Sequence, residues 1–419
     1  MRPETNLFHR HILTNGITLL LQQNSSVDLV AGRIFFKNAG SIWEKRVKGG
    51  LFNLLSRVIT KGTEQYSSQE IADKIESIGA SLGTDATNDY FLLSLKAVTS
   101  DFAEILELAS EILQKPTFPE NEIDLERHLT LESIRSSREQ PFNVAYSQLR
   151  ESMYQEHPYA ISVLGQEDSL KSLTRSDLQT CHQNYIRPEH CVISLSGNIS
   201  FDEALQLIEK FFAPWQNNYS SAFEPLKIAE VINNPQYIYT HKDTQQEIVM
   251  LGYFASSIFS EDYPALKLLN TYLGSGLSSR LFVELREKRG LAYDVSAMYP
   301  PRQDLSQFIF YIGTAPENTQ TAKLGLQEEA ERLVKDPLSE EELQNAKNKL
   351  LGKYALSKQT NSEVAQINGW YETIGLGVEF DSKFNEIIEQ VTPKNAQEVA
   401  QKYFSQPYIS QVGPQEIDQ

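Results

Sequence analysis

Residues 49–63 read Gly-Gly-Leu-Phe-Asn-Leu-Leu-Ser-Arg-Val-Ile-Thr-Lys-Gly-Thr, and this stretch indicates a short amphipathic helix. Its leucines and valine recur at the spacing of one helical face, which favours packing of that face against a core. The Gly-Gly pair precedes the helix and Lys-Gly-Thr ends it. The sequence therefore predicts a helix over residues 51–60, and this helix contains Asn53, Ser56 and Arg57.

Strands are expected before and after this helix. Asn15-Gly16 lies between two apolar segments, which is the strongest short-range signal for a β-hairpin. A β-rich segment over residues 27–38 leads into the helix. Further strands are expected near Leu82 and over residues 90–98 and 191–196, and long helices over residues 101–114 and 120–139.

The same order of elements begins again in the second half of the chain. A strand at 248–254, a helix at 263–273, a Gly-Ser-Gly turn at 274–276 and a strand at 308–313 follow one another there. A chain of 419 residues is also too long for one ordinary core. We therefore expect an α/β fold of the α+β type, in which two similar units each hold an antiparallel-rich sheet flanked by helices. The expected boundaries are an N-terminal unit at 1–214, a linker at 215–235 and a C-terminal unit at 236–419.

The composition is that of a folded protein with an acidic surface, with 40% hydrophobic residues, 22% charged residues and a net charge of −17. Such a field repels phosphate backbones and anionic lipid surfaces, so neither nucleic acid nor a membrane is an expected partner. The charge is interpreted either as a solubility device or as an acidic wall that attracts basic peptides. Cys181 and Cys191 lack a metal-binding spacing and are interpreted as free thiols. With no secretory segment or long apolar run, the expected location is the cytoplasm.

The run Gly40-Ser-Ile-Trp-Glu44, followed by residues 50–63, resembles a family signature. In pitrilysin-type and mitochondrial-processing-peptidase-type zinc metallopeptidases this segment reads G-x-x-H-F-L-E-H-x-x-x-K-G-T. The resemblance covers nearly the whole chain and implies that the two units are the halves of a clamshell. Further matches fall in the family's order at Glu126-Arg127, Glu132-Ser-Ile134, Pro141, His157-Pro-Tyr159, Gly165, Tyr185, Pro188 and Gly197-Asn198.

The resemblance implies that this chain has lost its own zinc site. Active members hold zinc through the inverted motif H-x-x-E-H and a downstream glutamate, and the motif glutamate is the general base. By position these four residues correspond to Asn53, Ser56, Arg57 and Ser133. A guanidinium has no lone pair to donate to a metal, so no metal and no other cofactor is expected in this chain. Glu132 lies one residue from the distal ligand position and is interpreted either as a solvated carboxylate or as a salt-bridge partner.

A second family signature is retained in residues 278–295, which read Ser-Ser-Arg-Leu-Phe-Val-Glu-Leu-Arg-Glu-Lys-Arg-Gly-Leu-Ala-Tyr-Asp-Val. The resemblance implies that Arg286 and Tyr293 are the catalytic pair that reaches the zinc site of the other half. A phenol can stabilise the oxyanion that forms on a peptide carbonyl, and a guanidinium can anchor substrate carbonyls. The competing interpretation is an exposed basic helix end followed by a half-buried strand tyrosine.

The resemblance favours a non-catalytic subunit of a heterodimeric zinc peptidase that cleaves small unfolded peptides. The expected partner is a sister chain that carries an intact H-x-x-E-H motif and therefore the zinc. Two alternatives stay open: a structural scaffold subunit, and a peptide-binding homodimer without peptidase activity. Loss of the metal motif fits all three, whereas retention of Arg286 and Tyr293 favours the first.

Overall fold

The computed structural model describes residues 8–216, 226 and 228–416, which form two compact units. Each unit draws on both halves of the sequence. The predicted linker at 215–235 lies partly outside the described residues, so this division of the chain stays a prediction. Unit 1 takes its described residues from Met1–Ile134, Ile161–Lys227 and Leu356–Asp381, and unit 2 takes them from Arg135–Ala160, Ile228–Ala355 and Ser382–Gln419.

Unit 1 is built on a six-stranded sheet in the order β1-β2-β6-β3-β5-β4. The β2–β6 pair is parallel and every other pair is antiparallel. The predicted hairpin at Asn15-Gly16 is the β1–β2 connection, where Gly16 adopts a φ of 92° that favours glycine. The strands are β1 (Phe8–Ile12), β2 (Thr18–Gln23), β3 (Leu29–Lys37), β4 (Ser81–Ala86), β5 (Tyr90–Val98) and β6 (Cys191–Gly197).

Unit 2 contains a five-stranded sheet in the order β7-β11-β8-β10-β9. The β7–β11 pair is parallel and the other three pairs are antiparallel. This order and these directions repeat those of β2-β6-β3-β5-β4 in unit 1, which confirms the predicted fold of two similar units. The strands are β7 (Tyr237–His241), β8 (Glu247–Ala255), β9 (Asp294–Met298), β10 (Ser306–Thr314) and β11 (Tyr408–Gly413).

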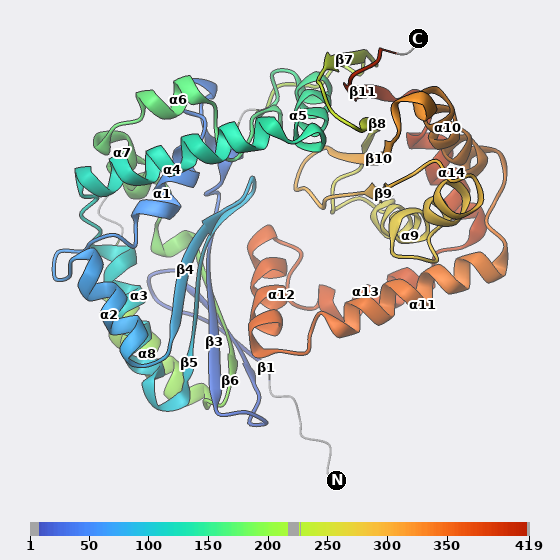
Figure 1. Cartoon of the computed structure of the whole chain (residues 1–419). Helices are drawn as coiled ribbons and strands as arrows, with labels where there is room; N and C mark the ends of the chain where they lie inside the picture. The colour runs from blue at the N-terminus through green and yellow to red at the C-terminus, as the bar shows by residue number, and fades with distance from the viewer. Residues whose placement is uncertain (1–7, 217–225, 227, 417–419) are drawn as a thin grey trace. The chain divides into compact units, whose positions relative to one another are not determined.

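Helices of unit 1 cover the sheet on both faces (Figure 1). The larger core lies between the strands and the helices α1, α3, α7 and α8, and it includes the completely buried Leu54, Leu55 and Val58 of α1. The apolar face predicted from residues 51–58 is therefore the core face. The helices are α1 (Leu51–Val58), α2 (Ser68–Ser77), α3 (Phe102–Gln114), α4 (Glu120–Glu139, which continues into unit 2), α6 (Glu167–Ser172), α7 (Arg175–Tyr185), α8 (Phe201–Phe212) and α12 (Asn361–Ile374).

The opposite face of this sheet is covered by α12, which comes from the C-terminal part of the chain. Gly369 allows this packing because a Cβ atom there would lie 2.4 Å from Cε2 of Phe35 on β3. Phe35 is buried with Leu20, and Trp370 packs against this small cluster. Arg10 Nη2 donates to Glu372 Oε1 of α12 at 2.8 Å. Unit 1 thus depends on a segment that lies far from the rest of it in sequence.

Unit 2 packs α5 against β8 and β11, and α10 against β8 and β10. Residues 282–288 form a π-helix, which is rare in proteins and usually limited to single turns. Within the described residues, no helix combines the length and the apolar character needed to cross a membrane. The remaining helices are α5 (Pro141–Tyr154), α9 (Tyr263–Gly274), the π-helix η6 (Phe282–Lys288), α10 (Thr319–Lys335), α11 (Glu340–Leu356), α13 (Phe380–Glu389) and α14 (Pro393–Tyr403).

Candidate functional site

The helix α1 begins at a buried carboxyl group. Gly50 has a φ of 91°, and its N–H donates to Glu44 Oε2 at 2.8 Å. The N–H of Phe52 donates to the other oxygen, Glu44 Oε1, at 2.7 Å. Glu44 is 8% exposed, and burial raises its pKa to about 8 despite these hydrogen bonds. This carboxyl satisfies donors that would otherwise be unpaired at the start of α1.

The residues that replace the metal motif form hydrogen bonds within their own helices. Ser56 Oγ donates to the carbonyl oxygen of Asn53 at 2.8 Å, and both residues are buried. Arg57 Nε lies 3.4 Å from Asn53 Oδ1, so the asparagine accepts the hydrogen bond. Ser133 is exposed on α4, and its hydroxyl donates to the carbonyl of Leu129 at 2.9 Å. These side chains therefore form hydrogen bonds within the helices that carry them.

Glu126 of α4 is a residue of this region to which sequence reasoning gave no role. It is 6% exposed, and Lys61 Nζ lies 3.0 Å from its Oε1. Arg57 Nη1 approaches its Oε2 to 3.9 Å. The available signal was a pair of cations, Arg57 in the last turn of α1 and Lys61 three residues after this helix ends, which favour a carboxylate nearby. Glu126 therefore joins α4 to the end of α1 by charge.

The residues at the metal-equivalent positions do not fit a zinc ion. Zinc in proteins takes imidazole, thiolate or carboxylate donors, and Asn53, Ser56, Arg57 and Ser133 provide none of these. The Arg57 guanidinium instead brings a fixed positive charge to the position of the second motif histidine. Among the described residues, no group of three His, Cys, Asp or Glu side chains is arranged to hold a metal ion. Glu132 is exposed and forms no such group.

Arg286 and Tyr293 lie on one segment of unit 2, between α9 and β10. Arg286 belongs to the π-helix η6 and is exposed, with its guanidinium carbon 4.9 Å from the ring centre of Phe282. Gly290 has a φ of 64°, which favours glycine, and it ends the helical turn. Tyr293 lies immediately before the first residue of β9, and 57% of its surface is exposed.

The backbone around Tyr293 is fixed although its side chain is exposed. Its N–H donates to the carbonyl of Gly313 on β10 at 2.8 Å. Thr314 Oγ1 donates to the carbonyl of Leu291 at 2.6 Å, and Thr314 is completely buried. The strand β10 thus holds the chain while the phenol points away from the core.

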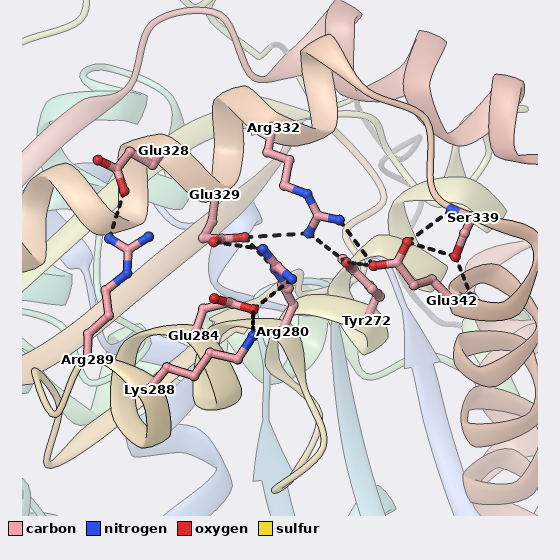
Figure 2. Close-up of polar contacts among 10 residues, drawn as sticks. All are labelled: Tyr272, Arg280, Glu284, Lys288, Arg289, Glu328, Glu329, Arg332, Ser339 and Glu342. Atoms are coloured by element: carbon pink, nitrogen blue, oxygen red, sulfur yellow. Dashed lines mark hydrogen bonds and ion pairs between the residues drawn. The ribbon is translucent and has the colours of Figure 1, made fainter.

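The other cations of this segment are neutralised by carboxylates (Figure 2). Arg280 contacts Glu284 at 2.8 Å and Glu329 at 2.7 Å. Lys288 contacts Glu284 at 2.7 Å, and Arg289 contacts Glu328 at 2.7 Å. Within the described part of the chain, Arg286 is the one cation between residues 280 and 289 without a carboxylate partner. An exposed and uncompensated guanidinium is available for carbonyl or carboxylate groups of another molecule.

The repeated unit, the altered motif on α1 and the Arg286–Tyr293 segment define the class of protein: a two-unit α/β chain of the inverted-motif metallopeptidase type. The sequence model described as "Insulinase (Peptidase family M16)" matches residues 18–167. The model described as "Peptidase M16 inactive domain" matches residues 172–350. Together these two models of one family account for most of the chain, which therefore belongs to the M16 peptidase family.

Relatives and solved structures are similar over their full length. The uncharacterized zinc protease YmxG of Bacillus subtilis is 28% identical over 406 residues, covering 96% of this chain and 97% of the relative. An uncharacterized zinc protease of Rickettsia bellii is 25% identical over 415 residues, covering 97% of each.

Two crystal structures share the fold. A protease from Helicobacter pylori superposes with a TM-score of 0.89 at 22% identity, covering 97% of this chain and 99% of that one. A peptidase M16 inactive domain from Pseudomonas fluorescens also has a TM-score of 0.89, at 24% identity, covering 98% of this chain and 99% of that one.

Proposed function

We propose that this chain is the non-catalytic subunit of a heterodimeric zinc peptidase and contributes Arg286 and Tyr293 to the active site of a sister chain with an intact His-x-x-Glu-His motif. The observation that carries the proposal is the exposure of these two side chains. Arg286 has no carboxylate partner among the described residues, whereas its cationic neighbours Arg280, Lys288 and Arg289 are all paired. The interpretation as an ordinary basic helix end does not account for this difference.

The two side chains suit the binding of a peptide and the stabilisation of the charge that develops when its carbonyl is attacked. The motif residues of the sister chain would hold a zinc ion, which would supply an activated water for attack on the peptide carbonyl. The Tyr293 hydroxyl donates a hydrogen bond to the oxygen on which negative charge develops. The Arg286 guanidinium binds a neighbouring substrate carbonyl or carboxylate in a two-point contact, which orients the peptide. Neither role requires a metal ligand from this chain.

The proposed substrates are small unfolded peptides, and the net charge of −17 favours basic ones over acidic ones. The cytoplasmic location is likewise a proposal, and the two buried free thiols are compatible with a reducing compartment. The partner is defined by its chemistry: a second M16 chain from the same genome whose first helix carries His-x-x-Glu-His.

Mixing the purified chains tests the proposal. This chain alone is expected to carry no stoichiometric zinc and to leave a library of short fluorogenic peptides intact. The mixture with the sister chain is expected to contain one zinc per heterodimer and to cleave peptides in a zinc-dependent manner. Zinc-dependent cleavage by the isolated chain would contradict the proposal.

The two alternative functions are separable outcomes of the same experiment. A stable heterodimer whose cleavage rate is the same with Arg286→Ala or Tyr293→Phe identifies a scaffold subunit. Failure to bind any sister chain, together with self-association and binding of peptides, identifies a peptide-binding homodimer. Analytical ultracentrifugation of the isolated chain and of the mixture distinguishes these states.

A further inference from the structure

The segment that carries Arg286 has an unusual backbone. The π-helix η6 spans seven residues, whereas π-helical geometry normally occurs as a single turn inserted in an α-helix, often at functional sites. The wide turn continues past η6, because the N–H of Leu291 donates to the carbonyl of Leu285 at 2.8 Å. Such a backbone is less stable than an α-helix and needs external contacts to persist.

The helix α10 provides these contacts at three points. Leu285, in the middle of η6, is completely buried against Gly325, where a Cβ atom would lie 2.7 Å from Leu285 Cδ2. Before η6, Arg280 is bound by Glu329. After η6, Arg289 is bound by Glu328. The first, middle and last parts of the segment are therefore all held by one short stretch of α10.

Of these contacts, the one at Glu329 is buried and has two hydrogen bonds. Arg280 Nε donates to Glu329 Oε2 at 2.7 Å and Arg280 Nη2 donates to Oε1 at 3.3 Å. The Glu329 side chain is 4% exposed, whereas the side chain of Glu328 is 59% exposed. A buried pair with this two-point geometry fixes the position of both side chains far more than a solvated pair does.

The same buried carboxylate belongs to a larger network (Figure 2). Arg332 lies 4.0 Å from Glu329 and donates to the hydroxyl of Tyr272 at 3.2 Å. Tyr272 in turn donates to Glu342 at 2.8 Å, and Glu342 also accepts from Ser339. The network thereby connects the beginning of η6 to α9, α10 and the start of α11.

We propose that Glu329 is a positioning residue that holds the η6 segment in the conformation in which Arg286 and Tyr293 are presented to a partner. The inference rests on the proposed function for its catalytic consequence, but not for its structural one. Arg286 takes no part in the network and stays exposed, so the carboxylates fix the segment without neutralising its functional cation. The Leu285–Leu291 hydrogen bond extends this order towards Tyr293.

The first test uses the isolated chain. Amide hydrogen exchange over residues 282–293 is measured in Glu329→Gln, with Glu328→Gln as the matched control. A hydrogen bond to a charged group is strong enough that its loss is expected to speed exchange about 10-fold to 100-fold in this segment, with no change in the strands of unit 1. Equal exchange in Glu329→Gln and in the wild type would overturn the proposal. If Glu329→Gln does not fold, Gly325→Ala disturbs the same segment through Leu285 and must give the same local increase.

The second test uses the heterodimer and separates this inference from the proposed function. Glu329→Gln is expected to lower kcat about 10-fold to 100-fold, because small displacements of catalytic groups are costly, while KM changes little. Glu329→Asp keeps the carboxylate and is expected to retain part of the rate that Glu329→Gln loses. The control variant Glu328→Gln is expected to keep the wild-type kcat. In the double variant with Tyr293→Phe the combined loss should be smaller than the product of the two single losses, since part of the effect of Glu329→Gln acts through the Tyr293 hydroxyl.

The outcomes of this second test are distinct. A large effect of Tyr293→Phe without any effect of Glu329→Gln refutes the positioning role and leaves the proposed function intact. If Tyr293→Phe has no effect, the proposed function fails, and the exchange measurement on the isolated chain still decides whether Glu329 orders the segment.

Discussion

Replacement of Glu44 by glutamine is expected to remove the contribution of this residue to the pH dependence of the stability of unit 1. The buried Glu44 carboxyl remains protonated in the folded chain up to its raised pKa of about 8, whereas in the unfolded chain it ionises near its usual pKa of 4.5. Between these two values the folded state binds more protons than the unfolded state. The free energy of unfolding therefore falls as the pH rises through this window.

The magnitude follows from the size of the pKa shift. Each pH unit in the window removes up to about 1.4 kcal/mol, so the full loss approaches about 5 kcal/mol. Glutamine does not titrate and retains one acceptor oxygen, but its NH2 group cannot accept a hydrogen bond, so either the N–H of Gly50 or that of Phe52 loses its acceptor. The Glu44→Gln variant should therefore be less stable than the wild type near pH 5, by about 1–3 kcal/mol for the unpaired N–H. This difference should shrink or change sign by pH 8, because only the wild type loses stability through the titration of Glu44.

Tryptophan fluorescence is a suitable probe, because all three tryptophans (Trp43, Trp215 and Trp370) belong to unit 1. Urea unfolding is followed from pH 5 to pH 8 for both proteins, and the difference between them isolates Glu44 from all other titrating groups. Parallel stability curves for the two proteins would refute this account of Glu44. A wild-type stability that rises relative to the variant would show that the carboxylate at the start of α1 is preferred in its charged form.

Three further predictions concern the packing of unit 1. Glu126→Gln should lower the free energy of unfolding by about 1–3 kcal/mol, because Lys61 and Arg57 lose a buried partner but are themselves partly exposed. The control Glu139→Gln, at an exposed position, should change this free energy by less than about 0.5 kcal/mol. Equal effects of the two variants would contradict the pairing of Glu126. Gly369→Ala should cost about 1–3 kcal/mol through the clash with Phe35, whereas Gly352→Ala, where a Cβ atom meets nothing within 4 Å, should not destabilise. Burial raises the pKa of the Cys181 and Cys191 thiols, so neither should react with a disulfide reagent at pH 8 until urea unfolds the chain. Fast labelling of the native protein would contradict the burial of these thiols.

Local patterns predicted the regular elements well. The helix expected over 120–139 is α4 with the same bounds, and the strand expected over 90–98 is β5. These segments carry their signal in nearby residues, through hydrophobic periodicity and capping. The repeated order of elements also predicted two similar units, which the matching strand orders of the two sheets confirm.

Local sequence patterns could not predict features that depend on contacts between residues far apart in the chain. The packing of α12 on the sheet of unit 1 joins Gly369 to Phe35, and nothing near either residue indicates the other. The π-helical turn η6 packs Leu285 closely against Gly325 of α10, a contact between distant residues, whereas the local sequence indicates an ordinary helix. The burial of Glu126 likewise required the relative placement of α1 and α4.

In the candidate site, too, some features were predictable from residue identity and others required the structure. The identities of Asn53, Ser56, Arg57 and Ser133 excluded a set of zinc donors from chemistry alone. The exposure of Arg286, and the pairing of the cations around it, required the structure. The identity of the proposed partner would be encoded in another chain and is therefore beyond any pattern in this one.

The central claim is tested most directly by the kcat of the reconstituted heterodimer with Tyr293→Phe in this chain. The account predicts a decrease of about 100-fold, the typical cost of removing one donor to an oxyanion. Tyr66→Phe, at a half-buried tyrosine of unit 1, serves as the control and should leave kcat unchanged. An unchanged kcat in Tyr293→Phe would contradict the claim that this chain serves the active site of its partner.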